Sequence, residues 1–168
     1  MKINLDTKTK KISFCAIMAS LAIVLSTLEH FVPIDLLIPI PGIKIGFANI
    51  VTLICIYYVG YKETLSVIFI RCAIVNLLFK TFVSFVFSIS GAVLAFLVMI
   101  LLKRYVKLFS LTGISIAGAA SFNIGQIAAC AILLKNVYIF NYLPFLLWAS
   151  IPCGIIVAVV TMPFLNKN

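Results

Sequence analysis

Polar and ionisable side chains inside long apolar stretches are the residues of this chain that could do chemistry. Arg71 stands in the middle of an apolar run, where a guanidinium needs an acceptor, either a carboxylate such as Glu29 or an anionic ligand. The neutral polar groups can contact a small molecule or hydrogen-bond neighbouring helices. The candidate ligand-contacting residues are Lys44, Asn49, Arg71, Asn76, Asn123 and Gln126.

Residue patterns that support catalysis are missing from the sequence. Only four residues are acidic, and the two aspartates, Asp6 and Asp35, are far apart, so no aspartate pair can hold magnesium. No GxxxxGK[ST] phosphate loop occurs, and His30 is the one histidine. Five cysteines stand singly, without the spacing of a disulfide framework or a zinc site. We therefore expect a protein that is not an enzyme and has no cofactor or metal.

Composition places the chain in a membrane. Of 168 residues, 64% are hydrophobic and 10% are charged, whereas a soluble domain is about half apolar and about a quarter charged. So much apolar surface cannot be hidden inside a small core, and lipid is the solvent that suits it. The net charge of +9 comes from short clusters at the ends of apolar runs. This pattern is typical of membrane anchors and argues against a nucleic-acid partner.

Six apolar stretches are long enough to cross a bilayer as helices. We therefore predict an all-α membrane protein, a six-transmembrane-helix bundle in one membrane domain covering residues 1–168. The predicted spans are 12–31, 43–60, 63–79, 81–102, 111–134 and 142–165.

The distribution of basic residues predicts that the N-terminus and the C-terminus are both cytoplasmic. With this orientation nine basic residues lie on the cytoplasmic side and three on the outer side, as the positive-inside rule requires. The cytoplasmic set is Lys2, Lys8, Lys10, Lys11, Lys62, Lys103, Arg104, Lys107 and Lys167, and the outer set is Lys44, Lys80 and Lys135.

The outer connection between the first two spans, residues 31–44, is unusual. Three prolines and a glycine exclude a regular helix, yet most of its side chains are apolar. Two interpretations remain open: a lid that rests on the bundle, or a loop that lies in the membrane interface. The residues that we assign to a gate are Pro33, Asp35, Pro39, Pro41 and Gly42.

Small residues recur along the first span. Ala16 and Ser20 are four residues apart, as are Ala22 and Ser26, a spacing that lets another helix approach closely. The approaching helix could belong to a partner or to the same bundle.

Several segments resemble one family of membrane proteins. The run PGIKIGFANIVTL (residues 41–53), together with Pro39 and Ile40 before it, resembles the signature of proteins labelled "heptaprenyl diphosphate synthase component I", also called the Gx transporter family. Residues 88–92, 115–119 and 123–126 are similar to the same family. The family pattern has a histidine where this chain has Phe122, so no role of that histidine carries over.

This family in turn is similar to the substrate-binding S-components of energy-coupling factor (ECF) transporters. The resemblance implies an S-component in a bacterial cytoplasmic membrane that captures a small molecule from outside, with anionic vitamins or isoprenoid or quinone precursors as candidates. It also implies that Ala16, Ala19 and Ser20 dock on a transmembrane coupling subunit driven by two ATPase subunits. The alternative is a non-catalytic membrane partner of a polyprenyl diphosphate synthase or a quinone-biosynthesis enzyme.

Overall fold

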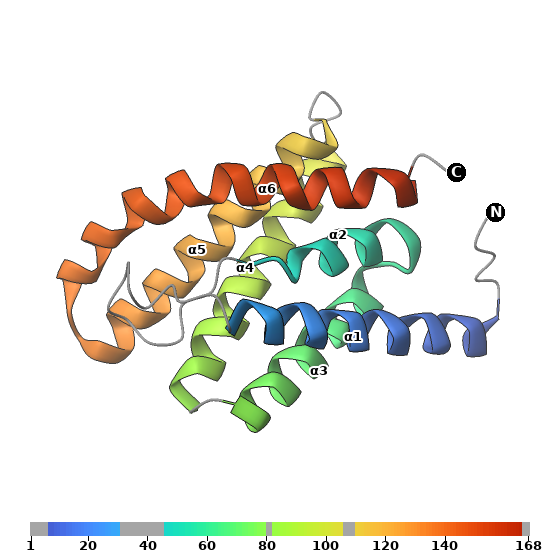
Figure 1. The fold of residues 1–168 in the computed structure, drawn as a ribbon, viewed down its shortest axis with the longest axis horizontal. Coiled ribbons are helices and arrows are strands. Elements are labelled where there is room, and N and C mark those ends of the chain that lie inside the picture. The colour runs from blue at the N-terminus through green and yellow to red at the C-terminus, as the bar shows by residue number, and fades with distance from the viewer. Residues whose placement is uncertain (1–6, 31–45, 80–81, 106–109, 166–168) are drawn as a thin grey trace.

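The computed structural model describes residues 7–30, 46–79, 82–105 and 110–165, and these ranges contain helices and no strand. The helices are α1 (Lys8–His30), α2 (Asn49–Tyr58), α3 (Tyr61–Phe79), α4 (Phe82–Tyr105), α5 (Leu111–Leu134), the 3-10 helix η2 (Val137–Tyr142) and α6 (Leu143–Leu165). Figure 1 shows α1 and α6 as long helices on either side of the short α2.

Four helical stretches in the described ranges are long and apolar enough to cross a membrane. They are α1, α4, α5 and the continuous stretch of η2 and α6. The ten-residue α2 is shorter, and α3 carries Lys62, Glu63 and Arg71 within 19 residues. The prediction of an all-helical membrane protein is confirmed, whereas the count of six spans and the placement of the termini stay predictions.

The second predicted span differs from the observed helix. We predicted a span over 43–60, but α2 begins at Asn49. Before it Gly46 has a φ of +98°, and its carbonyl accepts a hydrogen bond from Asn49 N at 2.9 Å. This tight turn needs a left-handed backbone, which glycine adopts readily, so the helix cannot extend through it. The resulting helix is about 15 Å long, roughly half the thickness of a bilayer core.

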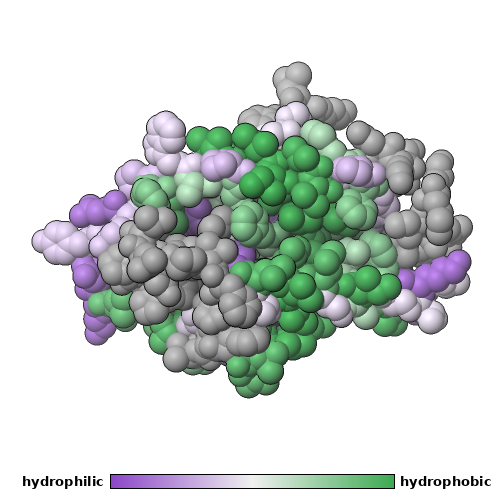
Figure 2. Space-filling model, in the orientation of Figure 1, coloured by the Kyte–Doolittle hydropathy of each residue, from purple (hydrophilic) through white to green (hydrophobic). Residues whose placement is uncertain are grey.

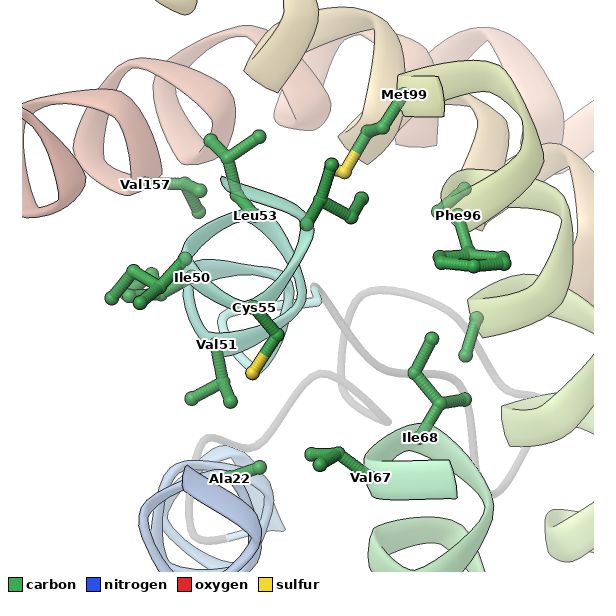
Figure 3. Packing of buried hydrophobic residues seen from close by; sticks show 14 of the residues in the cluster. Ala22, Ile50, Val51, Leu53, Cys55, Val67, Ile68, Phe96, Met99 and Val157 are labelled. Carbon is green, nitrogen blue, oxygen red and sulfur yellow. The ribbon is translucent and has the colours of Figure 1, made fainter. Parts of the chain in front are cut away.

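The short helix α2 is the centre of the bundle and packs against each of the other five α-helices. Residues 49–56 are all buried, as expected for a helix that is apolar on every side. Figure 3 shows Leu53 near Val157 of α6 and Val51 near Ala22 of α1. On the opposite side of α2, the side chains of α3 and α4 complete the same cluster (Figure 3).

The outward faces of the surrounding helices are apolar. Leu77 is 87% exposed and Trp148 is 76% exposed. Large apolar side chains therefore cover a surface that in a soluble protein would consist largely of charged and polar residues. On the face shown in Figure 2, hydrophobic residues cover the middle and hydrophilic residues gather toward the two ends. This is the distribution that a lipid environment favours.

One end of the bundle carries most of the described charges. At this basic end α1 and α3 begin with Lys8, Lys10, Lys11, Lys62 and Glu63, and α4 ends with Lys103 and Arg104. Lys103 Nζ donates a hydrogen bond to the carbonyl of Ile56 at 2.9 Å and lies 3.8 Å from the centre of the Tyr57 ring. The Tyr58 hydroxyl donates to the carbonyl of Phe164. These contacts hold the last turn of α2 against α4 and α6.

Glycines allow α4 and α5 to approach until their backbones touch. A methyl group at Gly125 would lie 2.8 Å from the carbonyl oxygen of Ser90 and 2.9 Å from Cα of Gly91. Ser90 Oγ bonds both its own helix and the carbonyl of Gly125, at 3.0 and 3.2 Å. Because the obstructing atoms are backbone, no side-chain rotation could make room for a methyl group.

We therefore expect Gly125→Ala to destabilise the bundle by about 1–3 kcal/mol, the usual cost of overpacking. Thermal unfolding of the purified protein in detergent measures the effect. Ile124→Ala, one residue earlier on an exposed face, is the control and should lower the unfolding temperature much less. Equal stability of Gly125→Ala and the wild type would mean that α4 and α5 are not in backbone contact.

Candidate functional site

A polar site surrounds the first turn of α2, in the interior of the bundle. A methyl group at Gly46 would lie 3.0 Å from Nδ2 of Asn49 and 3.1 Å from Cδ1 of Phe122. The missing side chain therefore lets the Asn49 amide and the Phe122 ring of α5 meet beside the start of α2. Asn49 is 1% exposed, and neither atom of its amide has a hydrogen-bond partner among the described residues.

Helices α4 and α5 continue this site. A methyl group at Gly91 would lie 2.7 Å from the carbonyl oxygen of Phe122 and 2.9 Å from Cγ of Gln126. Ser88 stands three residues before Gly91 on α4, and its buried hydroxyl has no partner within the described ranges. Two of the predicted contact residues, Asn49 and Gln126, thus lie against the same aromatic residue, Phe122.

Glu29 closes the site from α1. Its carboxylate accepts a hydrogen bond from the backbone N–H of Phe47, in the turn that precedes α2. It is 3% exposed and is close enough to the Cys153 thiol of α6 to interact with it electrostatically. A carboxylate at a helix N-terminus satisfies a free N–H and is stabilised by the helix dipole. Glu29 therefore fixes the position of α2 relative to α1.

The other predicted asparagines are partly engaged in helix packing. Asn123 Nδ2 donates to the carbonyl of Leu146 on α6 at 3.0 Å, and Asn76 Nδ2 donates to the carbonyl of Cys72 on its own helix at 2.7 Å. In both side chains the Oδ1 atom is buried and has no partner in the described part of the chain. Asn123 therefore holds α5 to α6 and still presents an acceptor. The sequence left two uses open for Asn123, helix packing and contact with a small molecule, and its side chain has a group for each.

Arg71 is 4% exposed and lies on the core-facing side of α3. Its one polar contact in the described ranges is from Nη2 to Sγ of Cys72, at 3.7 Å. The sequence left open an ion pair between Arg71 and Glu29. Within the described ranges, the two side chains do not form one. No contact places Arg71 directly against Asn49.

The remaining predicted site residues lie outside the described ranges. They are Lys44 and the gate residues Pro33, Asp35, Pro39, Pro41 and Gly42, for which the gate stays a prediction. Within the described residues, no group of three or more histidine, cysteine, aspartate or glutamate side chains could hold a metal ion. None of the five cysteines, all of which lie in the described ranges, forms a disulfide.

A second feature is an apolar groove of about 700 Å³ between α1 and α3 near the basic end. Ala16, Ala19 and Ser20, the three residues predicted to dock a partner, all line it. Ser20 Oγ donates to the carbonyl of Ala16 at 3.0 Å, so the hydroxyl is satisfied and the face stays smooth. Lys8, Lys11 and Glu63 stand at the groove as well.

Comparison with known proteins identifies the family of the chain. Residues 18–164 match the family described as "Heptaprenyl diphosphate synthase component I". The chain belongs to this family. No curated protein is found to be similar to it. The described part of the run PGIKIGFANIVTL, from Gly46 to Leu53, forms the turn before α2 and the first residues of α2.

Sequence reasoning did not select several residues of the site. Phe122 was set aside because it replaces a histidine, yet its ring is 1% exposed and contacts the turn at Gly46. Glu29 was considered only as a partner for Arg71, and its bond to Phe47 was not foreseen. Glycine at 46, in a segment otherwise predicted to be a span, was the signal that could have indicated a break in the helix.

The two asparagines of the site should respond differently to removal of their amides. We expect Asn123→Leu to lower the ligand-free stability by about 1 kcal/mol, because the bond to Leu146 is lost. Asn49→Leu should leave it unchanged or raise it, because the buried amide of Asn49 has no partner to lose. Thermal unfolding in detergent compares the two variants. If both lower stability equally, Asn49 is part of helix packing and not of a ligand site.

Proposed function

We propose that this protein is the substrate-binding S-component of an ECF-type importer and captures a small molecule between α2, α4 and α5. The observation that carries the proposal is the fully buried amide of Asn49, neither polar atom of which has a hydrogen-bond partner among the described residues. A buried amide without partners costs free energy. A ligand that hydrogen-bonds it would recover that cost, and Phe122 beside it supplies the apolar wall typical of small-molecule sites.

The proposed site is reached from the end of the bundle opposite the basic end. Basic residues favour the cytoplasmic side of a membrane, so the first turn of α2 would face outward and the basic end inward. The half-length of α2 is consistent with this arrangement, because a ten-residue helix is about 15 Å long and its first turn would therefore lie inside the bilayer. The segment 31–45, directly before α2, would cover the ligand as a gate.

The groove between α1 and α3 would be the docking surface for the transmembrane coupling subunit. Small residues allow a partner helix to come close, and close packing is the main source of helix association in lipid. The groove lies at the basic end, on the side where ATPase subunits would act. The chain itself would neither hydrolyse ATP nor catalyse a reaction.

A second candidate is a non-catalytic membrane partner of a polyprenyl diphosphate synthase. The family description favours it, because that description names a component of such an enzyme. The two candidates predict different partners. Purification of the tagged chain from its host under mild detergent should bring ATPase subunits for the first candidate and a soluble prenyltransferase for the second.

Substitutions in the groove test the docking surface. Ala16→Trp and Ser20→Trp should each abolish co-purification of the ATPase and coupling subunits, because an indole would fill the groove. Small molecules retained by the isolated protein should be unchanged, since none of Asn49, Phe122 and Gln126 lines the groove.

Ile17→Trp is the matched control, because Ile17 is adjacent in sequence, 63% exposed, and not part of the groove. It should leave co-purification intact. Loss of the partner in all three variants, or loss of both partner and ligand, would contradict a dedicated docking role for the groove.

A further inference from the structure

Helix α3 turns a charged residue toward the core and apolar residues toward the surface. Its buried residues recur at helical spacing: Thr64, Val67, Ile68, Arg71, Cys72, Val75 and Asn76. Within this stripe Arg71 follows Val67 by four residues and Ile68 by three, so it lies between them on the same face. Figure 3 shows that Val67 and Ile68 point into the space shared by α1, α2 and α4. Arg71, in the same stripe, is buried as they are.

Arg71 is paired with no carboxylate in the described part of the chain. Its one polar contact there is with the weak acceptor Sγ of Cys72, although a guanidinium carries five donors and stays charged. A buried charge without a counter-charge is strongly unfavourable, more so in a bundle surrounded by lipid. Glu29, a buried carboxylate of the same bundle, bonds the backbone N–H of Phe47. The ligand-free protein therefore holds a buried cation whose anion is missing from its described residues.

The register of the α2–α3 hairpin brings Arg71 to the depth of the proposed site. The two helices are joined by a turn at Gly60, where φ is +115°. Asn49 lies nine residues before Tyr58 and Arg71 ten residues after Tyr61, so each is about 15 Å along its helix from the turn. Because α2 and α3 pack together, the guanidinium and the unpaired Asn49 amide are at the same level of the bundle.

From this juxtaposition we propose that the captured molecule is an amphipathic anion whose carboxylate or phosphate group is bound by Arg71. This inference rests on the proposed function and adds the substrate class. A guanidinium binds either anion through two parallel hydrogen bonds. The Asn49 amide would bind a neutral polar group of the same molecule, and Phe122 would contact its apolar part.

The proposal predicts that Arg71→Gln weakens anion binding without lowering the stability of the ligand-free protein. Binding of the anion should weaken by at least about 30-fold, the lower range for removal of one member of a buried charge pair. The ligand-free protein should unfold at the same or a higher temperature than the wild type, because the substitution removes an uncompensated buried charge. A structural ion pair would behave in the opposite way and lose stability without ligand.

The experiment measures the small molecules that the purified proteins retain. Wild type and variants are purified from the host membrane, denatured, and the released molecules are quantified per mole of protein by negative-ion mass spectrometry. In parallel, thermal unfolding is recorded with phenyl phosphate and benzoate at fixed ionic strength, and with the uncharged analogues benzyl alcohol and benzamide. Comparing phenyl phosphate with benzoate distinguishes a phosphate from a carboxylate.

Three further variants complete the design. Arg71→Lys keeps the charge but not the forked geometry, so it should retain part of the anion binding even if Arg71→Gln does not fold. Arg104→Gln removes an exposed arginine at the basic end and should change nothing. Asp35→Asn tests whether a carboxylate outside the described residues pairs with Arg71, and its ligand-free stability should equal that of the wild type.

Retention of a carboxylate or phosphate compound by the wild type, and its loss in Arg71→Gln alone, is the expected result. The proposal is overturned if the retained compounds are neutral, if the anion persists in Arg71→Gln, or if no anion that depends on Arg71 is found in either assay. It is also overturned if Asp35→Asn destabilises the protein as Arg71→Gln does, since the two would then form an ion pair. A neutral compound lost in Asn49→Leu would leave the capture function standing and remove only the anionic class.

Discussion

Burial of α2 on every side is the constraint on which the rest of the structure depends. A helix of ten residues cannot cross a bilayer, so its polar first turn must be satisfied inside the protein. The surrounding helices do this with specific groups: Glu29 of α1 binds Phe47 N at one end, and Lys103 of α4 binds Ile56 O at the other. Anchored at both ends, α2 brings Asn49 to the middle of the bundle.

The buried polar groups divide into those that hold helices together and those that do not. Asn123, Ser90 and Tyr58 each bond a neighbouring helix, and such bonds stabilise packing where no water competes. Asn49 and the hydroxyl of Ser88 lack partners in the described ranges, although each is fully enclosed. Because unpaired buried groups are costly, these two side chains are the ones that the proposed ligand would have to satisfy.

The two ends of the molecule suit two different tasks. Near the basic end, α1 and α3 leave a groove with small residues along one wall, a surface that another helix can cover. At the opposite end, α2, α4 and α5 enclose polar side chains. The proposed import function would use both, because capture and energisation would take place on opposite sides of the membrane. The central position of α2, in contact with the helices of both features, provides a physical connection between them.

Much of the architecture followed from composition and periodicity alone. The apolar stretches predicted the helical membrane fold, with the fifth helix at the observed bounds Leu111–Leu134. The small residues of the first span marked the groove, and polar residues inside spans marked Asn49, Asn123, Gln126 and Arg71 as interior side chains. These inferences succeed because lipid admits few ways to satisfy a backbone or to bury a polar group.

What only the tertiary structure decided is which of these groups are paired. Hydropathy does not show that Gly46 ends the helix within the second predicted span. A single turn changes the mean hydropathy of a long stretch of residues very little. Nor does spacing along one helix show that Asn123 bonds Leu146 of α6, or that Phe122 meets both Gly46 and Gly91. Such contacts depend on how closely two helices approach, which the side chains of both helices set together. The sequence thus determined the helices and their inward faces, and packing determined which inward groups of the described residues bond to a neighbouring helix.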